Sequence, residues 1–284
     1  MAGRKKRLVA LLPLLITACT VLAGGQAFAT PAQDRQNLVN YFTGKFPAIP
    51  LDQYVYGSLA FDPDSMAQYK SIMDFPPFGA VIDQAQQMWN TPFKNGKTYA
   101  SCFPGGGKNV AGNYPYFDDH SNKVVTFEMA INACRTANGE PAYAYGDPAT
   151  MGKLTAYART LSDGMLMNVK VDGAAAQAAF DAGKKIFYAR RGQLGYSCAS
   201  CHVIEAGARY RSEILSPVLG QATHWPVFRG GDENLVTLQA RFAGCDKMLR
   251  AQPFAIGSPE YNDLEYFYSY ISNGLPLKAS VFRK

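Results

Sequence analysis

The chain has 284 residues and a formal net charge of +6. Four of its positive residues lie among the first seven, so the remainder carries only +2 and shows no basic, aromatic-rich segment of the kind that binds nucleic acid. Beyond the N-terminal leader, no segment has the length and apolarity of a membrane span. The size suits one large domain or two ordinary ones.

The first 29 residues are organised like a signal peptide. The basic residues Arg4 to Arg7 precede the apolar run Leu8 to Val21, which is short for a membrane span, and Ala27-Phe28-Ala29 fits a small-x-small cleavage site. The residues ending at Cys19 loosely resemble a lipoprotein site, but the better cleavage site follows them. We expect a mature chain that begins at Thr30 and is exported to the periplasm.

Removal of the leader leaves an odd number of cysteines. They are Cys102, Cys134, Cys198, Cys201 and Cys245. In an oxidising compartment idle thiols tend to pair, so each cysteine should have a role. Two of the five belong to a C-x-x-C-H motif, two more could form a disulfide, and one remains to be explained.

Two segments of the chain repeat at an offset of 111 residues. Residues 125–134 contain Val-Thr-Phe-Glu followed by Ile and Cys, and residues 236–245 contain Val-Thr-Leu-Gln followed by Phe and Cys. Further on, the apolar residues of 154–164 match those of 264–274. The repeat predicts a mainly α-helical fold of two related modules, residues 30–165 and 166–284.

The second module contains a haem attachment sequence. In Cys198-Ala-Ser-Cys201-His202 the two thiols can add to the vinyl groups of a porphyrin, and the imidazole can bind the iron. A redox dithiol or half of a zinc site has the same cysteine spacing, but the chain has no second C-x-x-C. We therefore predict one covalently attached haem c.

Two predicted helices lie on either side of this motif. Residues 174–190 include Gly183 and Phe187, the small residue and the aromatic residue that begin many cytochrome c domains. Residues 261–272 place leucine, isoleucine and aromatic side chains on one helical face. Helices of this kind cross beside the haem, so the second module is predicted to be cytochrome c-like. The repeat extends this prediction to the first module.

The first module keeps only part of a haem site. Cys102 aligns with the first haem cysteine, but Gly105 and Gly106 stand where the second thiol and the histidine would be. We predict that this module binds no haem. If both modules fold alike, Cys102 and Cys134 face the place that the haem would have filled, and we expect a disulfide between them.

The remaining thiol, Cys245, aligns with Cys134. It is one of five candidates for the second axial ligand of the iron, with His224, Met248, Met165 and Met167. Arg241 lies on the same face of a predicted helix, Lys247 and Arg250 follow, and nearby cations favour a thiolate. The arginines could equally lie on a solvated face or contact the haem propionates.

Together these motifs resemble the SoxA family, the larger subunit of the SoxAX cytochrome complex of sulfur-oxidising bacteria, in its single-haem form. The resemblance spans the mature chain. It rests on the motif at 198–202, on Arg241-Phe242-Ala243-Gly244-Cys245 followed by Arg250-Ala251-Gln252-Pro253, and on the two-cysteine first module. It implies that Cys245 binds the haem iron and forms the catalytic centre with Arg241. Members with two haems keep a complete motif in the first module, which this sequence lacks.

The resemblance implies an L-cysteine S-thiosulfotransferase, which joins thiosulfate to a cysteine of the carrier protein SoxYZ. Two electrons would leave through the haem to the small cytochrome SoxX, and Arg241 and Lys247 would offset the charge of thiosulfate. A plain electron carrier with Met248 or His224 as ligand stays open, as does a thiosulfate dehydrogenase that forms tetrathionate. The unpaired Cys245 disfavours the first alternative, and the erased first haem disfavours the second.

Overall fold

The computed structural model describes residues 29–210, 212–231, 233–279 and 281–283, so the predicted leader lies outside the described residues except for Ala29. Thr30, the expected start of the mature chain, caps the first helix. Its side chain accepts a hydrogen bond from the backbone of Gln33, and the Gln33 side chain accepts one from the backbone of Thr30. This capping box satisfies two amides that a helix start would otherwise leave unpaired.

The fold is mainly α-helical, as the sequence predicts. The helices are α1 (Pro31–Lys45), α2 (Pro63–Asp74), α3 (Gly79–Asn90), α4 (Phe127–Ala137), α5 (Lys153–Thr160), α6 (Gly173–Tyr188), α7 (Leu238–Met248) and α8 (Pro259–Ile271). Short helical turns are η1 (Leu51–Phe61), η2 (Tyr99–Cys102), η3 (Pro104–Gly107), η4 (Ala111–Asn113), η5 (Pro148–Gly152), η6 (Ser200–Ile204) and η7 (Gln221–Thr223). Among the described residues, none of the helices is long and apolar enough to cross a membrane.

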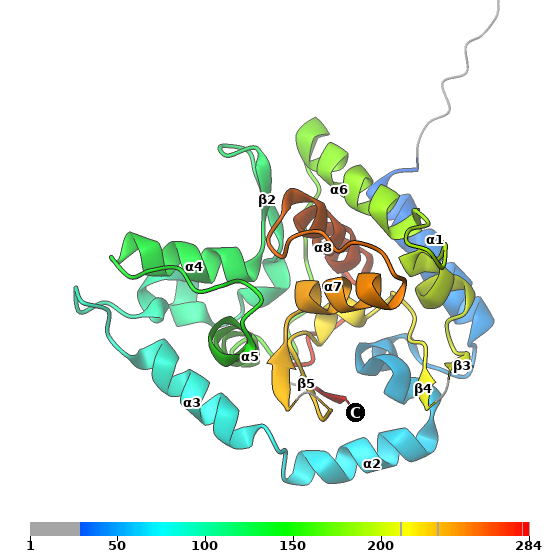
Figure 1. Cartoon of the computed structure of the whole chain (residues 1–284), viewed down its shortest axis with the longest axis horizontal. Coiled ribbons are helices and arrows are strands. Elements are labelled where there is room, and N and C mark those ends of the chain that lie inside the picture. Colours follow the sequence, from blue (N-terminus) through cyan, green and yellow to red (C-terminus); the bar gives the residue numbers. More distant parts are fainter. Residues whose placement is uncertain (1–28, 211, 232, 280, 284) are drawn as a thin grey trace, which may run out of the picture.

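The strands are short and form three small sheets. They are β1 (Tyr116–Asp118), β2 (Lys123–Val125), β3 (Arg209–Tyr210), β4 (Glu213–Ile214), β5 (Val227–Arg229), β6 (Asn234–Val236) and β7 (Val281–Arg283). β1 pairs with β2, β3 with β4, and β5 with β6, all antiparallel, while β7 joins β5 in parallel. Figure 1 shows α6 crossing α8, with α7 beside them, and α4 and α5 on the other side of the molecule.

The two helices predicted beside the haem motif are present and cross closely. They are α6 and α8. A Cβ added to Gly183 of α6 would lie 1.9 Å from the carbonyl oxygen of Asp263 in α8, so only glycine allows this approach. The fully buried Phe187 then packs against Phe267 and Tyr268, with ring centres 5.1 and 5.2 Å away.

The sequence repeat continues in the backbone. A β-hairpin followed by a helix occurs once as β1-β2-α4 and again as β5-β6-α7, and the strand registers match residue for residue at the offset of 111. Thr126 and Thr237 cap the two helices in the same way. We call residues 30–165 the first half and residues 166–284 the second half.

The two halves share one hydrophobic core. Its buried side chains come from α1, α4 and α5 as well as from α6, α7 and α8. The segment between the halves also pairs with the chain after α8, because Gly164 N–H donates to Leu277 at 2.9 Å and Leu277 N–H donates to Met165 at 2.8 Å. The division at residue 165 stays a prediction, since the core does not separate there.

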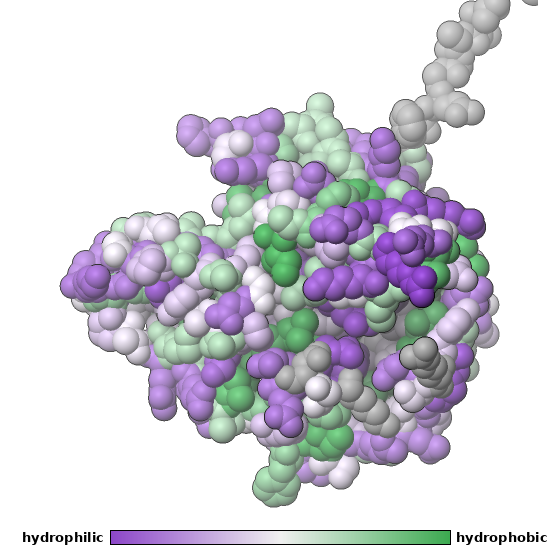
Figure 2. Space-filling view, in the orientation of Figure 1, coloured by the Kyte–Doolittle hydropathy of each residue, from purple (hydrophilic) through white to green (hydrophobic). Residues whose placement is uncertain are grey.

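The surface in the view of Figure 2 is mixed. Hydrophilic side chains are densest around α7 and the neighbouring loops, and hydrophobic ones lie in small patches between them.

Candidate functional site

One cavity brings together most of the residues singled out in the sequence. Its wall includes Cys198, Cys201 and Cys245, the three free cysteines of the described chain, with His202 and Arg241. The cavity has a volume of about 200 Å³. Residues from η6, α7 and α8 thus share one site.

The turn that carries the haem motif is held by two buried serines. Ser197 N–H donates to Oγ of Ser200, and Ser200 N–H donates to Oγ of Ser197, both at 3.1 Å. This reciprocal pair closes the start of the turn in the way that a capping box closes a helix. Cys198 and Cys201 follow three residues apart, so both thiols face the cavity.

His202 is held in the cavity wall by its Nδ1 atom. Nδ1 lies 2.8 Å from the carbonyl oxygen of Ser216 and also 2.8 Å from the amide nitrogen of Gln221, which donates to Oγ of Ser216 at 2.6 Å. We assign the ring proton to Nδ1, which donates to Ser216 and so leaves the lone pair on Nε2 for a metal. Burial lowers the pKa of His202 to about 4, so the ring is neutral near pH 7.

The donors fit a covalently held haem better than the other uses of a C-x-x-C pair. Burial raises the pKa of Cys198 to about 12 and also raises that of Cys201, whereas a redox dithiol requires a lowered thiol pKa. The described residues contain no group of three or more His, Cys, Asp or Glu side chains able to hold a metal ion. Two thiols and a neutral imidazole at one cavity wall are the donors that a c-type haem requires.

Arg241 and Cys245 lie one turn apart on α7 and both line the cavity. Burial raises the pKa of Cys245, while Arg241 and Arg229 act in the opposite direction. The cations therefore favour the thiolate, as the sequence predicts, while burial opposes it more strongly.

The other predicted residues lie in different surroundings. Lys247 is exposed and does not line the cavity. Met248 lines it and is 57% exposed, whereas His224 lines it from a buried position and bonds a backbone carbonyl through Nδ1. Met165 and Met167 belong to the hydrophobic core. Of the five candidate iron ligands, Cys245, Met248 and His224 are therefore beside the cavity.

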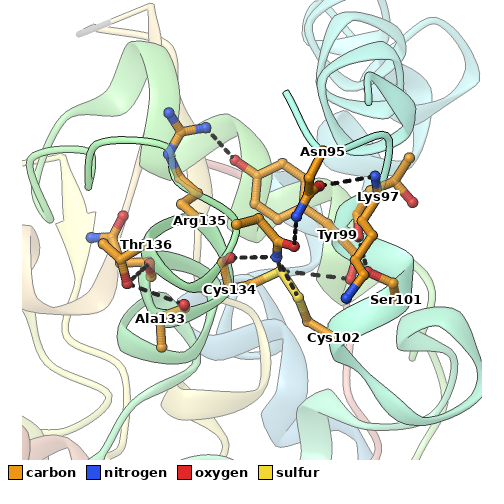
Figure 3. Close-up of a disulfide and its surroundings, with 12 residues drawn as sticks. Asn95, Lys97, Tyr99, Ser101, Cys102, Ala133, Cys134, Arg135 and Thr136 are labelled. Carbon is orange, nitrogen blue, oxygen red and sulfur yellow. Dashed lines mark hydrogen bonds between the residues drawn. A yellow bond between two sulfur atoms is a disulfide. The ribbon is translucent and has the colours of Figure 1, made fainter. Parts of the chain in front are cut away.

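The predicted disulfide is present in the first half. Cys102, at the end of η2, is bonded to Cys134 of α4 (Figure 3). Asn138 donates to the carbonyl oxygen of Cys134 at 2.8 Å and lies 3.5 Å from the Cys102 sulfur. Asn95 donates in turn to Asn138 at 2.8 Å. The disulfide therefore joins a loop of the first half to its helix, with amide side chains around it.

Next to the disulfide, the first half is packed with aromatic rings. Trp89 stacks on Tyr99 and Phe103, with ring centres 5.2 and 5.5 Å away. Gly105 and Gly106 follow with φ of 58° and 70°, a left-handed backbone unlike the helical turn of the haem motif. The region that corresponds to the haem motif thus has a different backbone as well as different residues.

Several residues of the cavity wall were not identified from the sequence. They are Arg191, Asp246, Tyr261 and Tyr268. The Tyr268 side chain hydrogen-bonds the thiol of Cys198. Asp246 could have been noticed, because the offset of 111 aligns it with a residue of opposite charge, Arg135. Arg191 and Tyr261 come from a loop and a helix start whose proximity arises only on folding.

Comparison with known proteins places the chain in one family. The domain family described as SoxA/TsdA, cytochrome c domain matches residues 84–167. The chain is 46% identical to L-cysteine S-thiosulfotransferase subunit SoxA of Chlorobaculum tepidum, over 86% of this chain and 85% of that protein. It is 39% identical to the subunit of the same name from Allochromatium vinosum, over 95% and 96%.

A solved structure agrees with these relatives. A chain in the crystal structure of SoxXA from P. pantotrophus superposes with a TM-score of 0.70 and 32% identity, covering 77% of this chain and 84% of that one. The likeness therefore extends far beyond the C-x-x-C-H motif that many cytochromes share. Because the relatives match in sequence over both halves and in fold over most of the chain, the chain belongs to the SoxA family, the cytochrome c subunits of L-cysteine S-thiosulfotransferases.

Proposed function

We propose that this chain carries one haem c on Cys198, Cys201 and His202 and catalyses the oxidative conjugation of thiosulfate to a cysteine of a SoxYZ-type carrier protein. The observation that carries this proposal is the composition of the cavity wall. It holds the attachment motif, a further thiol at Cys245 and the guanidinium of Arg241. A plain electron carrier needs only the first of these features.

The reaction forms one sulfur–sulfur bond. The carrier thiol loses its proton, its sulfur joins the terminal sulfur of thiosulfate, and two electrons are released. When bound, the haem supplies an iron that takes up electrons one at a time. Arg241 would hold the thiosulfate anion through paired N–H donors in a low-dielectric cavity. Cys245 offers a sulfur atom that can accept a sulfur fragment, and Lys247, which is exposed, would attract anions approaching from solvent.

The same proposal includes a small cytochrome of the SoxX type as partner. Two electrons per turnover exceed what one c-type iron takes up, so a second redox centre must lie nearby. The superposable structure is that of SoxXA from P. pantotrophus. Large apolar side chains are also exposed in the segments that form the cavity, as at protein contacts. They are Leu194, Tyr196, Ile204, Tyr210 and Met248.

A first half without haem and export to the periplasm complete the proposal. The left-handed backbone at Gly105 and Gly106 and the aromatic packing beside it support the absence of a second haem. The Cys102–Cys134 disulfide supports an oxidising compartment, in agreement with the signal-like leader.

Thiosulfate dehydrogenase activity is the second candidate, because the cavity wall that holds Arg241 and Cys245 could receive thiosulfate without a carrier protein. That reaction joins two thiosulfates to tetrathionate and needs no carrier thiol. Arg241 and Cys245 could serve either reaction, so the products have to decide between them.

The test is a turnover assay with the haem-loaded chain, its small cytochrome and thiosulfate, with and without a carrier that has a C-terminal cysteine. We expect cytochrome reduction that depends on the carrier, and a carrier whose mass rises by one bound thiosulfate. Tetrathionate formed without the carrier would favour the dehydrogenase. Haem reduction by added donors with neither product would leave only electron transfer. A pyridine haemochrome assay should find one haem per chain.

A further inference from the structure

The carboxylate next to Cys245 is held by two donors from other segments. Asp246 is 7% exposed, and its Oδ2 accepts a hydrogen bond from Nη1 of Arg191 at 2.6 Å and another from the hydroxyl of Tyr261 at 2.8 Å. All three residues line the cavity. One oxygen atom therefore connects α7, the loop before the haem motif and the start of α8.

Arg191 is also tied to the segment that follows α7. Its Nη2 donates to the carbonyl oxygen of Gln252 at 2.8 Å, and its guanidinium lies 4.0 Å from the ring centre of Phe254. Its backbone N–H donates to Tyr196 at 2.9 Å, which closes the loop leading into Cys198. Both the backbone and the side chain of Arg191 are therefore fixed.

The backbone of this loop also rests on the end of α7. Leu194 N–H donates to the carbonyl oxygen of Leu249 at 3.3 Å, and Gln193 N–H donates to that of Arg250 at 3.4 Å. Gly192, at φ +68°, passes so close that a Cβ there would lie 2.2 Å from the Leu249 oxygen. The loop before the haem motif and α7 are therefore held together as one unit.

The first half also has a guanidinium in contact with a carbonyl oxygen and an aromatic ring after its helix. There the arginine belongs to the helix itself and not to the preceding loop. Arg135 of α4 donates to the carbonyl oxygen of Pro141 at 2.8 Å and lies 3.5 Å from the ring centre of Tyr143. The residues 111 positions after Pro141 and Tyr143 are Gln252 and Phe254, which Arg191 contacts. On α7 the position that corresponds to Arg135 is occupied by Asp246, and Asp246 binds Arg191.

This exchange coincides with a change in how loop and helix are joined. In the first half the link is the Cys102–Cys134 disulfide. In the second half the aligned residues, Cys198 and Cys245, are free thiols, and the proposed function assigns them to the haem and its iron. They cannot then form a bridge, and the ion pair on the neighbouring carboxylate supplies the link instead.

We propose that Arg191, Asp246 and Tyr261 are positioning residues that set where Cys245 stands relative to the haem-attachment turn; we call them the clamp. The inference rests on the proposed role of Cys245 and adds that this role depends on the clamp. Without it only the long backbone hydrogen bonds of Gln193 and Leu194, at 3.4 and 3.3 Å, hold the loop against the end of α7. A shift of about 1 Å near reacting atoms can lower a rate by on the order of 100-fold.

The test compares Asp246→Asn with a matched control, Asp34→Asn, in the haem-loaded protein. Asp34 binds Lys184 at 2.6 Å, the distance of the Arg191–Asp246 pair, but lies outside the cavity wall. We expect Asp246→Asn to change the optical and EPR spectra of the iron and to lower thiosulfate-dependent turnover by about 10- to 100-fold. The control should keep both. A wild-type spectrum in Asp246→Asn overturns the clamp.

Two milder variants decide the question if Asp246→Asn does not fold. Tyr261→Phe removes one donor and keeps the ring, and Arg191→Lys keeps the charge but loses the second hydrogen bond. Each should change the spectrum less than Asp246→Asn, and wild-type spectra in both contradict the clamp. Cys245→Met separates the two proposals. If it leaves the spectrum unchanged, the ligand role of Cys245 is wrong; if it alone changes the spectrum, only the clamp is wrong.

Discussion

In the first half of the chain a disulfide joins a loop to α4, whereas in the second half the aligned cysteines are free and an ion pair joins the corresponding loop to α7. The first junction lies beside stacked aromatic rings, and the second lies on the wall of the cavity. One repeated backbone unit has therefore been stabilised in two ways. A covalent link suits a packed interior, while a site that needs its thiols for chemistry must be held by other residues.

The largest expected effect is loss of the disulfide. Cys102→Ser combined with Cys134→Ser should lower the free energy of unfolding by about 3–4 kcal/mol, because the unfolded chain is no longer cross-linked. Denaturant unfolding of the haem-loaded protein measures this change. The haem spectrum should stay as in the wild type, since the bridge lies in the other half. A variant as stable as the wild type would contradict a bracing role.

On the cavity side, Arg241→Ala should lower thiosulfate-dependent turnover by roughly 100-fold, or about 3 kcal/mol, through loss of one charge contact to the reacting anion. The optical spectrum should hardly change, because no proposed iron ligand is removed. Arg209→Ala is the control: this arginine pairs with Asp62 at 2.7 Å, and its side chain is 54% exposed. Equal activity in both variants would remove Arg241 from the catalytic centre.

Replacing the thiol tests the chemistry at α7 directly. Cys245→Met should keep the haem attached through Cys198 and Cys201, yet raise the reduction potential, because a neutral thioether replaces a sulfur anion at the iron. Redox titration followed by optical spectroscopy measures the shift. Met248→Leu, at the other sulfur-containing candidate ligand beside the cavity, should leave the potential unchanged. The reverse pattern would favour a plain electron carrier.

The smallest effect concerns a buried carboxyl pair between the halves, Glu128 of α4 and Glu265 of α8, near Arg159 and Tyr145. Burial raises the pKa of both carboxyls, and Glu128 adds to the rise at Glu265. The folded chain therefore keeps a proton that the unfolded chain releases above a pKa of about 4.3, so stability falls as the pH rises toward the folded-state pKa.

Glu265→Gln has no such proton to release. Its free energy of unfolding should depend less on pH than that of the wild type, by on the order of 1 kcal/mol between about pH 5 and pH 8. The amide oxygen can still accept the hydrogen bond that Gln239 donates at 2.9 Å. Denaturant titrations at the two pH values measure the difference. Equal slopes in both proteins would mean that Glu265 ionises normally.

Much of the fold was predictable where the signals are local or repeated. The helices beside the haem motif lie within two residues of their predicted ends, because apolar periodicity is a local signal. Gly183 indicated where the two helices cross. The disulfide followed from the aligned cysteines. The opposing effect of burial on the pKa of Cys245 was not predictable, because burial depends on packing and cannot be read from residue spacing.

The sequence by itself determined three features of this protein: the C-x-x-C-H motif on which the proposed haem attachment rests, the partner of Cys102, and the repeat that relates the halves. Such features depend on residues adjacent in the chain or copied within it. Only the tertiary structure decided that Arg191 and Tyr261 meet on Asp246 and that Lys247 lies outside the cavity wall. These outcomes depend on how a loop and two helices pack, and packing determines which charges are paired and which are desolvated.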